Sequence, residues 1–241
     1  MDVSVYSAMS AVKQQEQLIA VHSNNIANAN TNGFKSDNVA FKALYLNHQQ
    51  AGTVGGYTEL KSTGLDLTPG ALNHTGNPKD ITVAGNGFFQ LKNASGDLSY
   101  VRTLSLLTNQ DGLLVNMIGE RIQDVDGKSI HTGGEDFVVD GSGNVLKDAG
   151  GNQIHLGKLK VVELPREEAI KSPSGTVTTN PEFTPKNVQN SSVVSGYLES
   201  SNVNSVAAMA QLIEAQRNYE LGTKLFKAAK SIHSSSNSIL K

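Results

Sequence analysis

The chain contains no cysteine and no tryptophan among its 241 residues, and only 5% of its residues are aromatic. The lack of cysteine excludes disulfide frameworks, thiolate nucleophiles and cysteine-ligated zinc or iron–sulfur sites. Hydrophobic residues make up 38% of the chain and charged residues 17%, while glycine occurs 23 times. A chain this poor in large apolar side chains is expected to build only a modest core.

The sequence also lacks an excess of charge of either sign, because its formal net charge is only -2. This balance supplies no basic field for a phosphate backbone, so nucleic acid is not expected as a partner. Long apolar runs are missing too. The run nearest the N-terminus, Leu18–Val21, is far shorter than the ~20 residues that span a bilayer. The first residues show neither the basic nor the apolar region of a secretory signal. We therefore expect a soluble chain with no direct membrane span and no ordinary cleaved signal.

Catalytic and metal-binding patterns are weak. The stretch from Asp124 to Asp136 is similar to a calcium loop, but its glycine comes fourth instead of sixth, so a hairpin turn is expected there. The pair Gly85 and Gly87 lacks the third glycine of a phosphate loop. No two histidines lie three or four residues apart, as a helical metal site would need: His22, His48, His74, His131, His155 and His233. We expect no catalytic residue, no metal and no cofactor.

The N-terminal segment carries apolar residues at helical spacing, with intervals of four and three that are interrupted at Glu16 and Ser23. This pattern predicts an amphipathic helix of roughly 24 residues. The helix should end in the asparagine-rich stretch before Gly33, because Asn and Gly favour turns and left-handed backbone. The row consists of Val5, Met9, Val12, Ile19 and Ile26.

The C-terminal segment has a cleaner repeat, which predicts a second amphipathic helix of roughly 37 residues with Asn202 or Asn204 as its N-cap. Large residues recur every seven positions at Leu212, Tyr219, Phe226, His233 and Leu240. Small residues lie between them at Ala208, Ala215, Gly222, Ala229 and Ser236. A second apolar row lies beside the first at Leu221, Leu225, Ala228, Ile232 and Ile239.

Between the helices, short β-rich runs alternate with turn pairs, which is typical of antiparallel strands. The turn pairs are Asp111-Gly112, Asp126-Gly127, Asp140-Gly141 and Gly150-Gly151. The predicted fold class is therefore α+β, with long N- and C-terminal amphipathic helices flanking a central antiparallel all-β domain. We expect four segments: a helix with an Asn/Gly turn (1–35), an irregular linker (36–71), a β-rich domain (72–194) and a C-terminal helix (195–241).

The terminal apolar rows have two interpretations. Both helices could pack on the β-rich domain of their own chain, or both could be assembly elements that meet helices of other chains. The second interpretation makes the rows an assembly interface. Its members are Val5, Met9, Val12, Ile19, Ile26, Leu212, Tyr219, Leu225, Phe226, Ile232 and Leu240.

Three motifs resemble one known family. The first contains Asn28, Thr31, Gly33, Phe34 and Lys35, after a preceding Asn24-Asn25-Ile26-Ala27. The second runs from Thr68-Pro-Gly-Ala-Leu to Asp80-Ile-Thr-Val-Ala-Gly-Asn-Gly-Phe-Phe-Gln, and the third runs from Ser195-Gly-Tyr-Leu-Glu-Ser-Ser-Asn to Ile213-Glu-Ala-Gln-Arg-Asn-Tyr-Glu. In this order, they resemble bacterial flagellar rod and hook proteins. We expect the first motif to act as a hinge, with Gly33 at positive φ and Phe34 as a local anchor.

The resemblance implies a structural component of the flagellar drive shaft, without enzymatic activity. It implies export in the unfolded state through the flagellar type III apparatus and helical assembly with copies of itself and other rod proteins, in the part of the basal body within the periplasm. Met1-Asp2 and Asn202-Val203-Asn204 are most similar to the proximal-rod type. A distal-rod or hook-type axial protein is the alternative. A secreted β-rich binding module and a hydrolase are alternatives from other classes.

Overall fold

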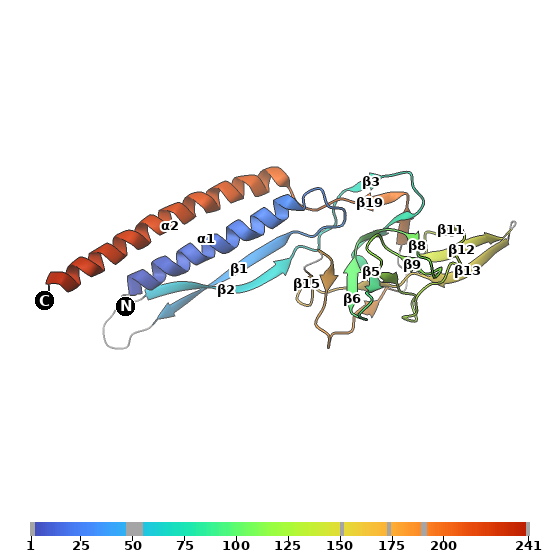
Figure 1. Cartoon of the computed structure of the whole chain (residues 1–241), viewed down its shortest axis with the longest axis horizontal. Coiled ribbons are helices and arrows are strands. Elements are labelled where there is room, and N and C mark those ends of the chain that lie inside the picture. The colour runs from blue at the N-terminus through green and yellow to red at the C-terminus, as the bar shows by residue number, and fades with distance from the viewer. Residues whose placement is uncertain (1–2, 47–54, 150–151, 173–174, 189–191, 240–241) are drawn as a thin grey trace. The chain divides into compact units, whose positions relative to one another are not determined.

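A computed structural model describes residues 3–46, 55–149, 152–172, 175–188 and 192–239 (Figure 1). It has one helix near each end and an antiparallel β-rich region between them, so the predicted α+β class is confirmed. The chain divides into two compact units. Unit 1 comprises Met1–Ala29, Asp37–Gly64 and Val203–Lys241, and unit 2 comprises Asn30–Ser36 and Leu65–Asn202.

Unit 1 consists of two helices and one two-stranded sheet. Helix α1 (Val3–Ala27) has 25 residues and helix α2 (Ser205–Ile239) has 35. The two helices pack side by side, and α1 also packs against strand β1 (Figure 1). Strand β1 (Asp37–Leu46) pairs with β2 (Gly55–Leu65). The helices thus find partners within their own unit.

The two strands of unit 1 correct one prediction, since segment 36–71 was expected to be irregular. Side-chain burial in β1 alternates, with Val39 and Phe41 half-buried and Asn38 and Ala40 exposed. That period of two is the pattern of a strand with one covered face. The Gly- and Thr-rich composition around β2 hides this pattern in the sequence.

Asparagine side chains define the ends of both helices. Asn204 is the N-cap of α2, because its Oδ1 accepts a hydrogen bond from the amide of Ala207 at 3.0 Å. At the end of α1, buried Asn25 makes a two-point contact with the first residue of β1. Its Oδ1 accepts from the amide of Asp37 at 2.9 Å, and its Nδ2 donates to the Asp37 carbonyl at 3.0 Å. The side-chain amide thus fixes how the chain leaves the helix.

The described residues of unit 2 form four antiparallel sheets. A nine-stranded sheet has the order β15-β16-β6-β5-β10-β9-β8, with β14 paired to both β5 and β17. The other sheets are β11-β12-β13, β18-β4-β7 and β19-β3. The strands of the large sheet are β5 (Gly87–Lys92), β6 (Leu98–Val101), β8 (Leu107–Thr108), β9 (Leu114–Val115), β10 (Arg121–Ile122), β14 (Val161–Glu163), β15 (Ile170–Lys171), β16 (Val177–Thr178) and β17 (Lys186–Asn187). The remaining strands are β3 (Leu72–His74), β4 (Asp80–Ala84), β7 (Thr103–Ser105), β11 (Phe137–Val139), β12 (Asn144–Ala149), β13 (Asn152–Lys158), β18 (Ser192–Ser195) and β19 (Tyr197–Glu199).

Strand β5 lies between two hydrophobic clusters. Phe89 belongs to the larger cluster, with Ile81, and its neighbour Phe88 belongs to the smaller one, with Tyr100. Successive side chains of a strand point to opposite faces, so both faces of β5 are covered. This explains the continuous apolar run at this point of the sequence.

One hairpin turn is repeated through unit 2. In each copy, the first residue's amide donates to the carbonyl four positions later, and the amide of a positive-φ glycine donates back to the first residue's carbonyl. The six copies run from Asn93 to Asp97, Asn109 to Leu113, Asn116 to Glu120, Asp124 to Lys128, Asp140 to Asn144 and Ser172 to Thr176. A three-residue loop with a left-handed glycine is a favoured way to join antiparallel strands.

These hairpin turns test the turn pairs that were predicted from the sequence. Asp111-Gly112 and Asp126-Gly127 are confirmed, because both glycines have a φ of +76°. At Asp140-Gly141 the turn is present, but the left-handed residue is Gly143, with a φ of +81°. The Asp140 side chain explains this, since it accepts from the amides of Ser142 and Asn144 and shifts the turn along the chain. Gly150-Gly151 lies outside the described residues.

Candidate functional site

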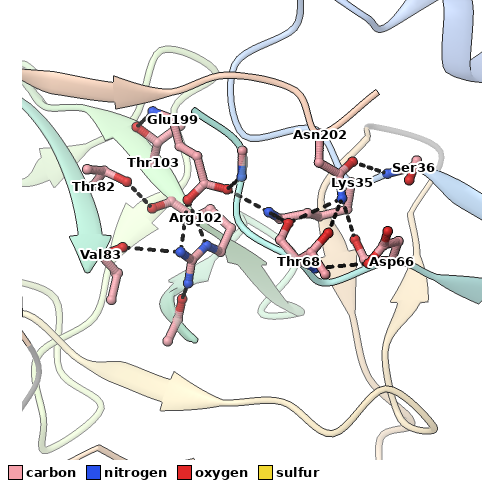
Figure 2. Close-up of polar contacts among 12 residues, drawn as sticks. Lys35, Ser36, Asp66, Thr68, Thr82, Val83, Arg102, Thr103, Glu199 and Asn202 are labelled. Atoms are coloured by element: carbon pink, nitrogen blue, oxygen red, sulfur yellow. Dashed lines mark hydrogen bonds and ion pairs between the residues drawn. The ribbon is translucent and has the colours of Figure 1, made fainter. Parts of the chain in front are cut away.

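A cluster of three buried charges brings distant parts of unit 2 together (Figure 2). Lys35 follows the Asn/Gly turn, Arg102 lies between β6 and β7, and Glu199 ends β19. Lys35 Nζ is 2.6 Å from Glu199 Oε1. The Nε and Nη2 atoms of Arg102 lie 3.0 and 2.9 Å from Glu199 Oε2. All three side chains are at most 1% exposed.

Backbone groups complete the hydrogen bonding of the cluster. Lys35 Nζ donates to the carbonyl of Thr68 at 2.7 Å, and the amide of Gly70 donates to Glu199 Oε1 at 3.0 Å. Arg102 donates to the carbonyl of Val83 at 3.2 Å and to that of Gly87. Buried charges are tolerated when they are paired and hydrogen-bonded, and each of these three side chains has both an ion pair and a hydrogen bond to the backbone.

The cluster holds two cations and one anion, and the pKa values of Glu199 and Lys35 shift for different reasons. Burial alone would raise the pKa of Glu199, but hydrogen bonds from Lys35 and Arg102 hold that pKa below its usual value. Burial lowers the pKa of Lys35, and the nearby Arg102 charge adds to this effect against the opposing attraction of Glu199. The carboxylate has two cationic partners, whereas Lys35 shares its ion-pair partner Glu199 with Arg102.

The residues before Lys35 place it in the cluster. Gly33 has a φ of +72°, as predicted from the sequence, and its amide donates to the Glu199 carbonyl at 2.7 Å. A β-carbon at Gly33 would lie 2.9 Å from Cγ2 of Thr103. Phe34 is buried, and Lys171 Nζ lies 3.7 Å from the centroid of its ring. The Gly-Phe-Lys sequence therefore combines a left-handed bend, an anchor and a buried charge.

The other predicted motif residues make local contacts. The Thr31 carbonyl accepts from the amide of Phe34 at 3.3 Å, and Asn28 Nδ2 donates to the Asn24 carbonyl at 3.0 Å. Asn202 was a predicted helix cap, but it binds elsewhere. Its Oδ1 accepts from the Ser36 amide at 2.8 Å, and its Nδ2 donates to the carbonyl of Asp66 at 2.8 Å (Figure 2).

The seven-residue row of α2 lies in the seam between the two helices of the chain. Ala208 and Ala215 are buried, and a β-carbon at Gly222 would lie 2.9 Å from Cγ2 of Val12 on α1. Six large residues of the rows are half-buried: Val12, Ile19, Ile26, Leu212, Tyr219 and Phe226. Within one chain, the small residue Gly222 thus faces α1, and contact of the rows with helices of other chains stays a prediction.

A second apolar face of α2 is exposed. We call it the α2 outer face and define it by Val206, Met209, Ile213, Leu221 and Leu225, which are 51–76% exposed. Val206 and Ile213 precede the buried Ala208 and Ala215 by two positions, which is about 200° around a helix. Val206 and Ile213 therefore point away from the seam, whereas Leu221 and Leu225 flank it, about 100° and about 60° from Gly222 around the helix. Met9 of α1 is also exposed. Leu240 and the side chains of Val5 and Ile232 lie outside the described part of the structure.

Sequence reasoning missed Arg102 and the role of Glu199. Glu199 lies within the third motif, and Arg102 interrupts a run of strand residues between Tyr100 and Leu104. A single charge inside such a run is a signal for a buried, paired residue. Its partner could not be identified from sequence, because the partner is 97 positions away.

Within the described residues, no group of three or more His, Asp or Glu side chains could hold a metal ion. In the same part of the chain, neither helix has the length and apolar composition needed to cross a membrane. The charge cluster is closed to solvent, and its ion pairs join three segments that are far apart in the sequence.

Comparison with protein families matches three parts of the chain. Residues 5–35 match the flagella basal body rod protein family, residues 82–179 the D1 domain of the flagellar hook proteins FlgE/F/G, and residues 194–239 the C-terminal family of flagellar basal body rod FlgEFG proteins. The first and last matches contain the predicted Asn/Gly motif and the α2 entry.

Individual relatives extend the similarity over nearly the full length. The flagellar basal-body rod protein FlgF of Caulobacter vibrioides is 30% identical over 236 residues, which cover 93% of this chain and 92% of that protein. FlgF of Escherichia coli is 28% identical, with coverage of 95% and 94%. FlgG of Bacillus subtilis is 26% identical, with coverage of 95% and 96%. The chain belongs to the family of flagellar basal-body rod proteins.

Proposed function

We propose that this structural component of the flagellar basal-body rod is held in the rod by the α2 outer face, which contacts neighbouring subunits. The observation that carries the proposal is the exposure of five large apolar side chains on α2, of which Val206 and Ile213 lie opposite the seam. Covering one such side chain contributes about 1.5–3 kcal/mol relative to leaving it in water. Several large apolar side chains exposed on one helix are typical of an interaction site.

An open helical array uses such a surface naturally. Its subunits make head-to-tail contacts, so the same face of every copy meets a different face of the next one. Of the residues predicted for the assembly interface, Leu225 and Met9 are exposed enough to take part directly. The half-buried residues of the seam act indirectly, because they hold α1 and α2 together and so present the outer face.

The finer assignments have separate support. The resemblance supports export of the unfolded chain through the flagellar type III apparatus, assembly within the periplasm and transmission of torque without catalytic activity or a cofactor. The lack of cysteine suits passage into an oxidising compartment. The motif residues favour the proximal-rod position, while relatives of both the FlgF and the FlgG type have similar identities, which supports the distal rod as the alternative. The functional division into segments 1–35, 36–71, 72–194 and 195–241 stays a prediction.

The test is a charge placed on the α2 outer face. Ile213→Glu should leave the thermal unfolding of the monomer unchanged, because the side chain is exposed. It should abolish motility and remove the protein from isolated basal bodies, since a buried carboxylate without a partner is strongly unfavourable. Asn218→Glu, at another exposed position of α2, is the matched control and should remain motile. Normal incorporation of the Ile213→Glu chain would contradict the proposal.

A further inference from the structure

One of the repeated hairpin turns of unit 2 differs from the others in what it exposes. The turn from Asn116 to Glu120 carries Met117 and Ile118 at its tip, with 77% and 65% of their surfaces exposed. The other described tips carry small or polar residues at one or both positions: Ala94-Ser95, Gln110-Asp111, Val125-Asp126 and Gly141-Ser142. Two large apolar side chains at a tip are therefore not a requirement of the turn.

The backbone of this turn is firmly held. Asn116 Oδ1 accepts from the amides of Ile118 at 3.1 Å and Glu120 at 2.9 Å, and Asn116 Nδ2 donates to Glu120 Oε2 at 2.8 Å. Ser99 Oγ donates to the other Glu120 oxygen at 3.0 Å. The two apolar side chains are thus presented on a preorganised support, which reduces the entropy lost when they bind.

A cavity of about 370 Å³ opens elsewhere on unit 2. Its lining includes the rings of Phe183 and Pro165, with Glu163, Thr184 and Lys186. At ~30 Å³ per molecule, this volume corresponds to roughly a dozen waters of the bulk liquid. An apolar lining with a few polar groups is typical of a site that receives an apolar group.

The tip and the cavity lie at opposite ends of the same strand. Arg121, which follows the turn, pairs in register with Lys92 at the end of β5. Glu163, which lines the cavity, pairs in register with Gly87 at the beginning of β5. Five residues of strand separate the two ends by ~17 Å. The two sites therefore cannot contact each other within one chain.

The charges beside the two sites are complementary. Within the described residues, the side chains of Arg121 and Glu163 make no ion pair or hydrogen bond, and both are exposed. Lys92 adds a second positive charge beside Arg121. The nearby carboxylate of Glu120 already accepts from Asn116 and Ser99. At the cavity, Lys186 is opposite Glu163 in register, but no ion pair joins them.

We propose that Met117 and Ile118 of one copy enter the cavity at Phe183 of a second copy, with Arg121 of the first copy paired to Glu163 of the second. The contact is head to tail, because one end of β5 meets the opposite end in the neighbour, and repetition gives an open filament. The proposal rests on the proposed function, since it requires that copies of the chain assemble. It adds a specific contact in unit 2 to the helix contact in unit 1.

Engineered cysteines test the contact in the full chain, which has no cysteine of its own. A Met117→Cys variant is mixed with a Thr184→Cys variant under assembly conditions and oxidised. The matched control replaces the first partner with Ser142→Cys, at an exposed tip of the same kind of turn. We expect several-fold more disulfide-linked heterodimer from the Met117 mixture than from the control. Equal yields would overturn the proposal.

Charge reversal in trans gives a second readout. Arg121→Glu added to the Met117→Cys chain should reduce the cross-link, and so should Glu163→Arg added to the Thr184→Cys chain. Mixing the two reversed chains should restore it, because the ion pair forms again with opposite polarity. Restoration cannot come from a general loss of folding. If the two substitutions lower the cross-link yield additively and the mixture of reversed chains does not regain it, the proposed ion pair is contradicted.

Sedimentation of the same samples separates the two hypotheses. Assemblies that sediment but show no preference for the 117–184 cross-link would overturn the contact in unit 2 and leave the α2 outer face intact. If the chains stay monomeric at every concentration, self-assembly is contradicted, and so is the proposed contact between the tip and the cavity.

Discussion

Replacing Glu199 by glutamine tests the role of the buried charge cluster in unit 2. Glutamine keeps the shape of the side chain but removes the negative charge that forms ion pairs with both Lys35 and Arg102. Both cations would then be buried without their ion-pair partner. Removing one partner of a buried pair typically costs about 3–5 kcal/mol. At ~2–4 °C per kcal/mol for a domain of this size, the midpoint of thermal unfolding should fall by roughly 6–20 °C.

The order of effects within the cluster is a sharper test than the size of one effect. Lys35→Met removes one of the two cations and leaves Arg102 bound to Glu199 through two nitrogens. We therefore expect a smaller loss of stability than for Glu199→Gln. The matched control is Asp136→Asn, which breaks the exposed ion pair with Lys79 and should leave the midpoint unchanged because exposed pairs contribute little.

Calorimetry of the purified chain measures all three variants. A Glu199→Gln midpoint close to that of the parent would refute the reasoning, since the cluster would then contribute no more than a surface pair. A larger loss of stability for Lys35→Met than for Glu199→Gln would also refute it. Glu199→Gln leaves two cations without their ion-pair partner, whereas Lys35→Met leaves Arg102 and Glu199 paired.

Three further predictions follow from described contacts. Because the pKa of Glu199 in the folded chain lies below the ordinary value of 4.5, its stabilising effect is present above that pH and is lost as the pH falls through the folded pKa. Acid unfolding should therefore be steeper for the parent than for Glu199→Gln. Gly33→Val should cost about 1–3 kcal/mol, since φ is +72° and the β-carbon would meet Thr103; an unchanged thermal midpoint would contradict this. Ala215→Leu should overpack the seam at a cost of about 1–3 kcal/mol and lower the melting temperature of the helices, measured by circular dichroism. Ala207→Leu, at an exposed position, should not lower it. Equal melting temperatures for the two variants would contradict the packing of Ala215 in the seam.

Local signals in the sequence predicted a large part of the fold. The left-handed glycines at 33, 112 and 127 were predicted because the conformation is a property of a few neighbouring residues. The helices were predicted for a similar reason, since the spacing of their apolar residues can be recognised within one continuous stretch of chain. The interface residues were harder. Periodicity shows that Ala215 needs a cover, but it does not show that α1 supplies it.

The missed features depend on distant partners. Arg102 is acceptable inside a β-rich run only because Glu199 meets it, and the run itself contains no sign of that partner. Strands β1 and β2 likewise depend on each other as pairing partners. Asn25 was predicted as part of an asparagine-rich turn, yet its contact with Asp37 depends on where the strand begins.

The charge cluster also sets the order in which unit 2 can fold. Each hairpin turn closes over a few residues, whereas the ion pair of Lys35 and Glu199 joins positions 164 apart. Bringing such distant positions together costs about 3 kcal/mol more chain entropy than closing a four-residue turn. The hairpins should therefore form early and the charge cluster late. A chain emerging from the ribosome has its two buried cations in place before their anion arrives. Completion of the unit then waits for Glu199, so the last strand of the β-rich region controls when the first motif after α1 becomes fixed.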